Sequence, residues 1–167
     1  KKNLMIRRLK KQVLPELPDK TRKVVPMKLK SYVEYNAAQD NFLTWLHTIS
    51  PAKAKKAKKS QALTKVGYLL RLVAQTKIDL VVQWVEEFFE SNPGKKLVGL
   101  TMHTYVIDRL KEKFPDAVFV NGQTTGVQRD RAVRAFQTNP KVRAFFGNWK
   151  AAGVGLTLHA AHNIAAL

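Results

Sequence analysis

Between residues 97 and 146 the sequence alternates short, mainly apolar runs with longer segments that are apolar on one side only. The short runs have the length and composition of buried strands. They are LVGLT (97–101), AVFV (117–120) and VRAFF (142–146). Apolar strands separated by amphipathic helices are typical of a parallel sheet covered by helices on both faces, so we expect an α/β fold. Residues 163–167 have the composition of a fourth strand.

Helix-capping residues precede the amphipathic segments. Thr76 with Asp79, and Thr125 with Gln128, have the spacing of a capping box, in which side chains bind the free amides at a helix start. Thr104 is positioned to cap a helix between these two. We therefore expect three helices to connect or precede the strands.

The first part of the chain is predicted to be helical. Apolar and aromatic residues recur at helical spacing over residues 29–49, and a second helix is expected over residues 61–74. Between them, residues 53–59 contain five lysines, whose charges repel one another. We interpret this run as a mobile loop or a frayed helix end. Solvated surface and nucleic-acid contact are both open as its role.

The composition favours a polyanionic partner. The 167 residues include 30 Lys and Arg against 12 Asp and Glu, and residues 1–65 hold 17 of the basic side chains but only 4 of the acidic ones. Without cysteine, disulfides and thiolate metal sites are excluded. No apolar run approaches the roughly 18 residues of a membrane span, and no signal-peptide pattern follows the basic start. We expect an intracellular protein, from a bacterium, a phage-infected cell or a nucleus.

The segment KAAGVGLTLHAA (150–161) directly follows the third predicted strand. Gly153 and Gly155 lack a Cβ, so backbone at these positions can approach a group outside the core, and we expect that group to be a phosphate. A tight connection between a strand and a helix is the alternative. His159 and His162 have a spacing that metal ligands use, but no third ligand is near them in the sequence. We therefore expect no metal site.

Four blocks of this sequence resemble, in order and spacing, the second motor lobe of Swi/Snf-type ATPases. They are LMIRRLKKQVLPELPDK (4–20), KLVGLTMHTYVIDRL (96–110), NGQTTGVQRDRAVRAFQ (121–137) and KAAGVGLTLHAAHNI (150–164). Each block alone is a loose pattern, but four in order are specific. Within the family, the sequence Ala-Ala-Gly at residues 151–153 resembles the annealing-helicase branch, bacterial and phage relatives included.

The resemblance implies a RecA-like lobe of the P-loop NTPase type, a parallel sheet sandwiched by helices, with an N-terminal helical projection. The implied division is an inter-lobe connection over residues 1–28, a helical projection with a lysine-rich loop over residues 29–75, and the RecA-like lobe over residues 76–167. The family's arginine-finger block would lie beyond Leu167.

The resemblance also implies which residues meet ligands. The implied DNA contacts are Thr101, His103, Gly122, Thr124, Lys150 and Thr157. The implied nucleotide contacts are Gly153, Gly155 and Leu156. Arg129 is interpreted as an internal brace, and Asn121 replaces the usual Asp while keeping its ability to form a turn. Structural roles are the alternative for several of these residues, with Thr101 as a helix cap and His103 as a packing or capping residue.

The implied function is an ATP-dependent helicase or translocase motor on double-stranded or branched DNA. ATP and Mg²⁺ would be held mainly by a first lobe of the same parent protein, because this sequence has no G-x-x-x-x-G-K-[ST] loop and no strand ending in paired acids. We therefore expect no catalytic residue in this chain and no ATP hydrolysis by it alone. A non-enzymatic, basic nucleic-acid-binding α/β module is one alternative. A nucleotide- or sugar-phosphate-binding α/β enzyme domain is another.

Overall fold

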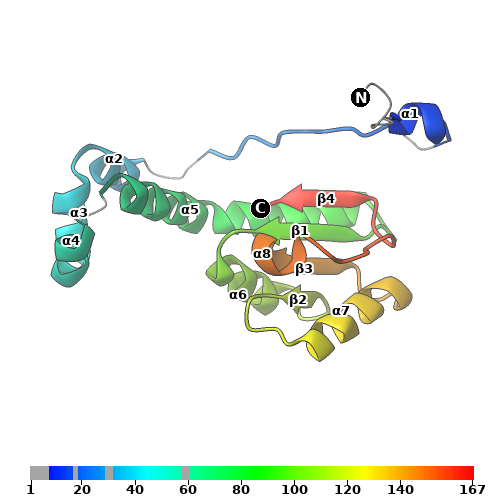
Figure 1. The fold of residues 1–167 in the computed structure, drawn as a ribbon. Helices are drawn as coiled ribbons and strands as arrows, with labels where there is room; N and C mark the ends of the chain where they lie inside the picture. Colours follow the sequence, from blue (N-terminus) through cyan, green and yellow to red (C-terminus); the bar gives the residue numbers. More distant parts are fainter. Residues whose placement is uncertain (1–7, 17–18, 29–31, 58–60) are drawn as a thin grey trace, which may run out of the picture.

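A sheet of four parallel strands forms the centre of the C-terminal part of the chain (Figure 1). The computed structural model describes residues 8–16, 19–28, 32–57 and 61–167. The strands are β1 (Leu97–Thr101), β2 (Val118–Val120), β3 (Ala144–Asn148) and β4 (Asn163–Ala166). Their order across the sheet is β2-β3-β1-β4. The predicted α/β fold with a parallel sheet is confirmed.

Because all strands run in one direction, their carboxyl ends share one edge of the sheet and their amino ends share the other. We call these the carboxyl edge and the amino edge. At the carboxyl edge Thr101 of β1 lies opposite Asn148 of β3. At the amino edge Leu97 of β1 lies opposite Asn163 of β4. A helix or a loop must therefore carry the chain back to the amino edge before each new strand begins.

Helices cover both faces of the sheet, as Figure 1 shows. One face carries α5 (Gln61–Ser91) and α6 (Thr104–Lys113), which contribute to the same buried cluster. The other face carries α7 (Gly126–Thr138) and α8 (Trp149–Ala152). The two central strands, β1 and β3, are buried along their whole length, whereas β4, at one edge of the sheet, alternates between half-buried and exposed residues. This three-layer arrangement is the RecA-like architecture that the resemblance implied.

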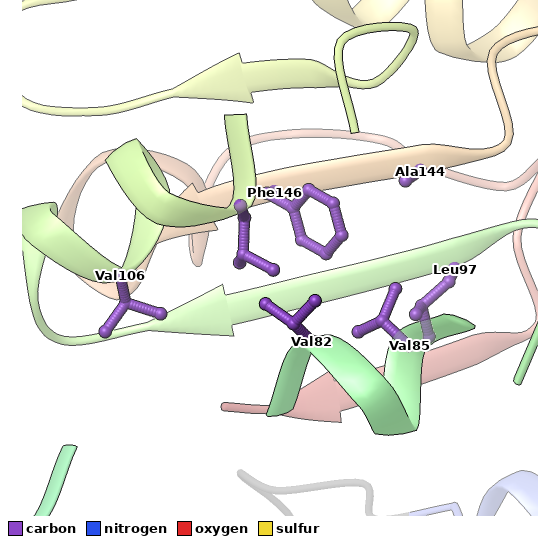
Figure 2. Close-up of a cluster of buried hydrophobic side chains, with 7 residues drawn as sticks. Val82, Val85, Leu97, Val106, Ala144 and Phe146 are labelled. Atoms are coloured by element: carbon purple, nitrogen blue, oxygen red, sulfur yellow. The ribbon is translucent and has the colours of Figure 1, made fainter. Parts of the chain in front are cut away.

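Packing of α5 against the sheet forms the larger part of one core (Figure 2). Val82 and Val85 of α5 lie against Leu97 of β1, with Phe146 of β3 beside them. On the opposite face, the rings of Phe136 and Phe145 pack with centroids 5.6 Å apart. Full burial of side chains of this size contributes about 1.5–3 kcal/mol each. These contacts fix the sheet and therefore the position of the loops at its carboxyl edge.

A separate small core lies at the N-terminal part of α5. Phe42, Leu46 and Ala54 are buried there, and the rings of Trp45 and Tyr68 pack against them. Three short helices supply this core together with α5: α2 (Val33–Asp40), α3 (Phe42–Ile49) and α4 (Pro51–Ala57). In Figure 1 these helices lie beyond the carboxyl edge of the sheet. The short helix α1 (Lys10–Val13) begins the described part of the chain.

The predicted helix boundary near Thr76 is wrong. α5 runs without a break through this position, so no helix ends at Ala74 and none begins at Thr76. The Thr76 hydroxyl donates to the carbonyl oxygens of Leu72 and Val73, at 3.1 and 2.9 Å. Because α5 is continuous, the amides that follow Thr76 are already bound within the helix and leave no free donors for a cap. The predicted division at residues 75 and 76 falls within this helix.

Other boundaries also differ from the prediction. The helix expected over residues 29–49 is interrupted at Asn41, whose backbone angles are not helical (φ −126°, ψ 59°), and residues 29–31 lie outside the described residues. In the lysine-rich run, residues 51–57 form α4, and residues 58–60 lie outside the described residues. The capping box of Thr125 and Gln128 is confirmed.

Candidate functional site

Three loops meet at the carboxyl edge of the sheet. Residues 102–103 follow β1, residues 121–125 follow β2, and α8 with residues 153–155 follows β3. Because β3 lies between β2 and β1, its loop lies between the other two. The carboxyl edge is where open α/β sheets bind ligands, since the helix N-termini that follow the strands present free amides. Eight of the nine predicted site residues lie in or next to these loops.

Thr101 ends β1 and is almost fully buried, at 1% exposure. Its hydroxyl accepts a hydrogen bond from the amide of His103 (3.4 Å), and its carbonyl oxygen accepts from the side-chain amide of Asn148 (3.4 Å). These contacts join β1 to β3 and shape the turn that leads into α6. Thr101 therefore acts on the site through its neighbours, and a phosphate contact from its hydroxyl would require the turn to open.

His103 is the N-terminal cap position of α6, which Thr104 was predicted to be. Its ring lies 5.7 Å from that of Tyr105, centroid to centroid. The guanidinium of Arg71, from α5, lies 5.8 Å from the Tyr105 ring centroid. Partial burial, and secondly the charge of Arg71, lower the pKa of His103 below its ordinary value. The lowered pKa favours the neutral form of the His103 ring at neutral pH.

The loop after β2 is held by Asn121. Its Oδ1 accepts from the amide of Gln123 (3.0 Å) and from the hydroxyl of Thr124 (3.2 Å), and its own amide donates to Thr124 Oγ1 (2.9 Å). Asn therefore performs the turn-forming role expected of it. Gly122 is exposed at the tip, whereas the Thr124 hydroxyl is already bound within the turn. Gly122 is the better placed of these two residues for a phosphate.

Arg129 was interpreted as an internal brace. It is half-buried on α7, and its Nε is buried without a hydrogen-bond partner among the described residues. The side chain therefore fills space beside the second loop without the hydrogen bonds that a brace would make. The interpretation as a brace stays a prediction.

The two glycines after β3 are required for different reasons. The amide of Gly153 donates to the carbonyl oxygen of Trp149 (2.9 Å), and a Cβ at Gly153 would lie 2.5 Å from that same oxygen. Gly155 has φ +77°, where L-residues are strained, and the space around it is open. Of these two glycines, Gly155 is therefore the one that combines a glycine-specific backbone with open space. Lys150, on α8 between Trp149 and the glycines, is exposed.

Leu156 and Thr157 belong to the segment that returns the chain to the amino edge. Leu156 packs against the core between the sheet and α7. The carbonyl oxygen of Thr157 accepts from Gln137 Nε2 (2.8 Å), in the last turn of α7. Since α7 begins at the carboxyl edge and runs back, its last turn lies near the amino edge (Figure 1). Thr157 is thus not brought together with the other predicted DNA contacts.

Gln137 was not singled out from the sequence, although it fixes this segment by three contacts. Besides its bond to Thr157, its Oε1 accepts from the amide of Ala160 (2.9 Å), and its Nε2 lies 2.8 Å from Nδ1 of His159. Its partners are 20 to 23 residues away in the sequence. No local pattern could therefore have identified it.

The described residues contain neither a group of side chains that could hold a metal ion nor a helix that could cross a membrane. No three or more His, Asp and Glu side chains within residues 8–16, 19–28, 32–57 and 61–167 are grouped so that they could hold a metal ion. Within those same ranges, no helix combines the length and the apolar character needed to cross a bilayer.

The sequence of this chain is similar to those of two animal proteins. The chain is 30% identical, over 96% of its length, to the Caenorhabditis elegans protein named SWI/SNF-related matrix-associated actin-dependent regulator of chromatin subfamily A-like protein 1 homolog. It is also 30% identical, over 97% of its length, to the mouse DNA annealing helicase and endonuclease ZRANB3. The predicted resemblance to the C-terminal lobe of Swi/Snf-type helicases is confirmed. No protein-family model matches the chain.

A solved structure has the same fold as this chain. The Sulfolobus solfataricus SWI2/SNF2 ATPase C-terminal domain superposes with a TM-score of 0.58 at 20% identity, covering 79% of this chain and 64% of that one. The chain spans 23% of the worm relative and 15% of the mouse relative. Both are animal proteins, so they do not support a bacterial or phage source, which was expected as an alternative to a nuclear one.

Proposed function

We propose that this chain is the C-terminal lobe of an ATP-dependent motor on double-stranded or branched DNA, supplying DNA-backbone contacts and one wall of an ATP cleft. The observation that carries the proposal is the position of α8 at the carboxyl edge. It presents exposed Lys150 on one side of the glycine segment that contains Gly155. The resemblance to Swi/Snf-type proteins, one of them named a DNA annealing helicase, supports DNA as the partner.

The DNA side of the proposed site uses charge without base recognition. Lys150 acts as a point charge on a backbone phosphate, and exposed Gly122 in the neighbouring loop lets a phosphate approach the backbone. His103 adds a neutral hydrogen-bonding group from the loop after β1. Contacts of this kind give binding that depends little on sequence and strongly on salt.

The nucleotide side rests on Gly155. Its amide donates to no group among the described residues, and no atom lies within 4 Å of where its Cβ would be, so a phosphate or ribose oxygen could approach it. The Gly153 amide is already bound to Trp149, and Leu156 anchors the segment to the core. We therefore propose that Gly155 makes the nucleotide contact and that Gly153 and Leu156 position it.

The described residues group no carboxylates that would hold Mg²⁺. We propose that a preceding lobe of the parent protein supplies the metal ligands and the phosphate loop, and that this chain alone does not hydrolyse ATP. In such a motor the two lobes close around the nucleotide and reopen after hydrolysis, each holding DNA phosphates in turn. The part of this chain is to hold the DNA backbone during one half of the cycle.

Binding of a fluorescent duplex at several salt concentrations tests the DNA part. Lys150→Ala should weaken binding equally for unrelated sequences and reduce the slope of log K against log salt by about 0.9. Lys141→Ala is the matched control, because Lys141 is also exposed but lies between α7 and β3, at the amino edge. Affinity that does not change with salt, or equal losses in the two variants, would contradict the proposal.

An ATPase assay tests the nucleotide part. The purified chain should show no turnover with or without DNA. Turnover that Gly155→Ala abolishes, and that persists through repeated purification, would show that the chain holds a complete catalytic site.

A further inference from the structure

Trp149 is an exposed aromatic side chain at the carboxyl edge. It directly follows β3 and is 43% exposed. The other tryptophans are packed: Trp45 against Phe42 and Tyr68, and Trp84 against Phe88. No aromatic ring packs on Trp149 within the described residues. A large apolar ring left in water at the edge where ligands bind suggests a partner that covers it.

The Trp149 ring lies against the backbone of Gly153. A Cβ at Gly153 would lie 3.3 Å from the ring atom Cε3, so the indole lies directly against this glycine. The carbonyl oxygen of Trp149 accepts from the Gly153 amide in the same turn. One side of the indole is therefore covered by the Gly153 backbone, and the exposed part of the ring is open to a ligand.

Trp149 is one of a row of residues with basic or apolar side chains that come from α5, α6 and the loops after β1 and β3. Thr101 lies opposite Asn148, so the residues that follow them, Met102 and Trp149, occupy adjacent positions. Met102 is 68% exposed. The row continues from Met102 to His103, to the Tyr105 ring and to the Arg71 guanidinium, at the distances given above. We call this the edge row: Arg71, Tyr105, His103, Met102, Trp149 and Lys150.

The edge row has the composition of a surface for unpaired nucleic acid. A cation stands at each end, and aromatic, imidazole and thioether groups lie between them, with no acidic side chain in the row. Aromatic rings bind single strands because every base has a face that can stack on them, while the cations bind the backbone. Inside a duplex both faces of each base are covered by the neighbouring bases. The indole of Trp149 can therefore stack on an unpaired base but not on a base inside a duplex.

We propose that the edge row binds a single-stranded DNA segment, with one unpaired base stacked on Trp149 and phosphates near Lys150 and Arg71. The inference rests on the proposed function and adds to it: the lobe would recognise the unpaired part of a branched DNA through Trp149, beyond the charge contacts it makes to any duplex.

Fluorescence of Trp149 in the full chain tests the stacking. A background carrying Trp45→Phe and Trp84→Phe leaves Trp149 as the single tryptophan, and both replacements keep an aromatic ring where the native ring packs. A short oligothymidylate should quench this fluorescence saturably, whereas a blunt duplex of equal charge and a free adenine nucleotide should not. Failure of the oligothymidylate to quench would overturn the proposal.

Affinity measurements complete the test. In the otherwise native chain, Trp149→Ala should weaken oligothymidylate binding about 5- to 100-fold, while Trp149→Phe should weaken it less, because a phenyl ring still stacks. Val154→Ala, which changes an apolar residue 88% exposed in the same segment, should have no effect and is the control. Circular dichroism of each variant checks that the fold is kept. Equal affinity in Trp149→Ala and the native chain would overturn the stacking.

These outcomes separate the two proposals. Duplex binding that depends on Lys150, together with unchanged Trp149 fluorescence, would refute the single-strand proposal and leave the proposed function standing. Quenching by the adenine nucleotide in place of the oligothymidylate would identify a nucleotide site and refute the single-strand proposal. Absence of binding to both duplex and single strand would refute both proposals.

Discussion

The side-chain amide of Gln137, in the last turn of α7, donates a 2.8 Å hydrogen bond to the carbonyl oxygen of Thr157. With its further contacts to His159 and Ala160, Gln137 fixes a segment that would otherwise cross the face of the sheet with few backbone partners. The path of this segment determines where the glycines that precede it lie. A polar residue remote from the carboxyl edge therefore helps to shape it.

Gln137→Ala should destabilise the fold by about 2 kcal/mol, because it removes the three hydrogen bonds of this side chain and leaves the amide of Ala160 unpaired. Urea unfolding measures this loss, and hydrogen exchange at Ala160 should speed up with it. Gln83→Ala is the control, since Gln83 is exposed and binds only Glu87 within α5. Equal losses in the two variants would show that Gln137 has no special role.

Alanine at Gly153 should cost more stability than alanine at Gly155. At Gly153 the new Cβ would lie 2.5 Å from a backbone oxygen, so α8 must shift, whereas at Gly155 the space is open and only the positive φ is unfavourable, by about 1 kcal/mol. Thermal unfolding of both variants tests the order. Gly67→Ala, inside α5 and free of neighbours, should instead stabilise the chain by up to about 1 kcal/mol. The reverse order of the first two would contradict the structure.

His103 should make stability fall as the pH falls below its ordinary pKa of 6.5. Burial and Arg71 lower the pKa of His103 in the folded state, so the unfolded chain takes up the proton first on acidification. The loss is complete once the pH is below the folded pKa, and above pH 6.5 the effect is absent. His103→Gln should therefore lose stability less steeply than the native chain in this window.

Arg71→Gln should raise the pKa of His103 towards its ordinary value without restoring it fully, because burial is the larger cause and remains. NMR titration of the His103 ring measures this pKa. Arg131→Gln, an exposed change on α7 at the other face of the sheet, should leave it unchanged. Superimposable titrations of His103 in all three proteins would argue against an electrostatic effect of Arg71 on the His103 pKa.

Arg143→Ala should destabilise the chain by about 3 kcal/mol. Its guanidinium donates to the carbonyl oxygens of Phe89 (3.1 Å), Asn92 (2.8 Å) and Lys95 (3.3 Å), which surround the C-terminus of α5. Charged hydrogen bonds of this kind, at the negative end of a helix dipole, are the stronger ones. Chemical denaturation measures the loss, with exposed Lys111→Ala expected to stay within about 0.5 kcal/mol. A similarly small change for Arg143→Ala would refute the capping role.

Elements specified by local patterns were predicted well. β1 has the predicted bounds because its five residues are mainly apolar and buried, and the capping box of Thr125 and Gln128 forms as expected. The same spacing at Thr76 failed, because a capping box forms only at a helix start, where the amides of the first turn have no carbonyl partner within the helix. Apolar residues on both sides of Thr76 continue one buried face, so tertiary packing keeps α5 intact.

The candidate site was predictable only in part. Strand order and direction bring Thr101, Gly122 and Lys150 to one edge, which a parallel sheet makes foreseeable. The place of Thr157 was not, because it depends on the contact with Gln137. The edge row was not either, since it joins Arg71 of α5 to residues that follow β1 and β3, and nothing in the spacing of these residues indicates that they meet.

Because α5 is continuous, it connects the core between α5 and the sheet to the small core formed with α2, α3 and α4. A 31-residue helix is about 46 Å long, and its C-terminal part is fixed to the sheet while its N-terminal part carries α2, α3 and α4. A rigid rod anchored at one end acts as a lever arm, so a small tilt of the sheet becomes a much larger sweep of the three helices. If the lobe swings when a motor closes, this lysine-bearing end travels farthest.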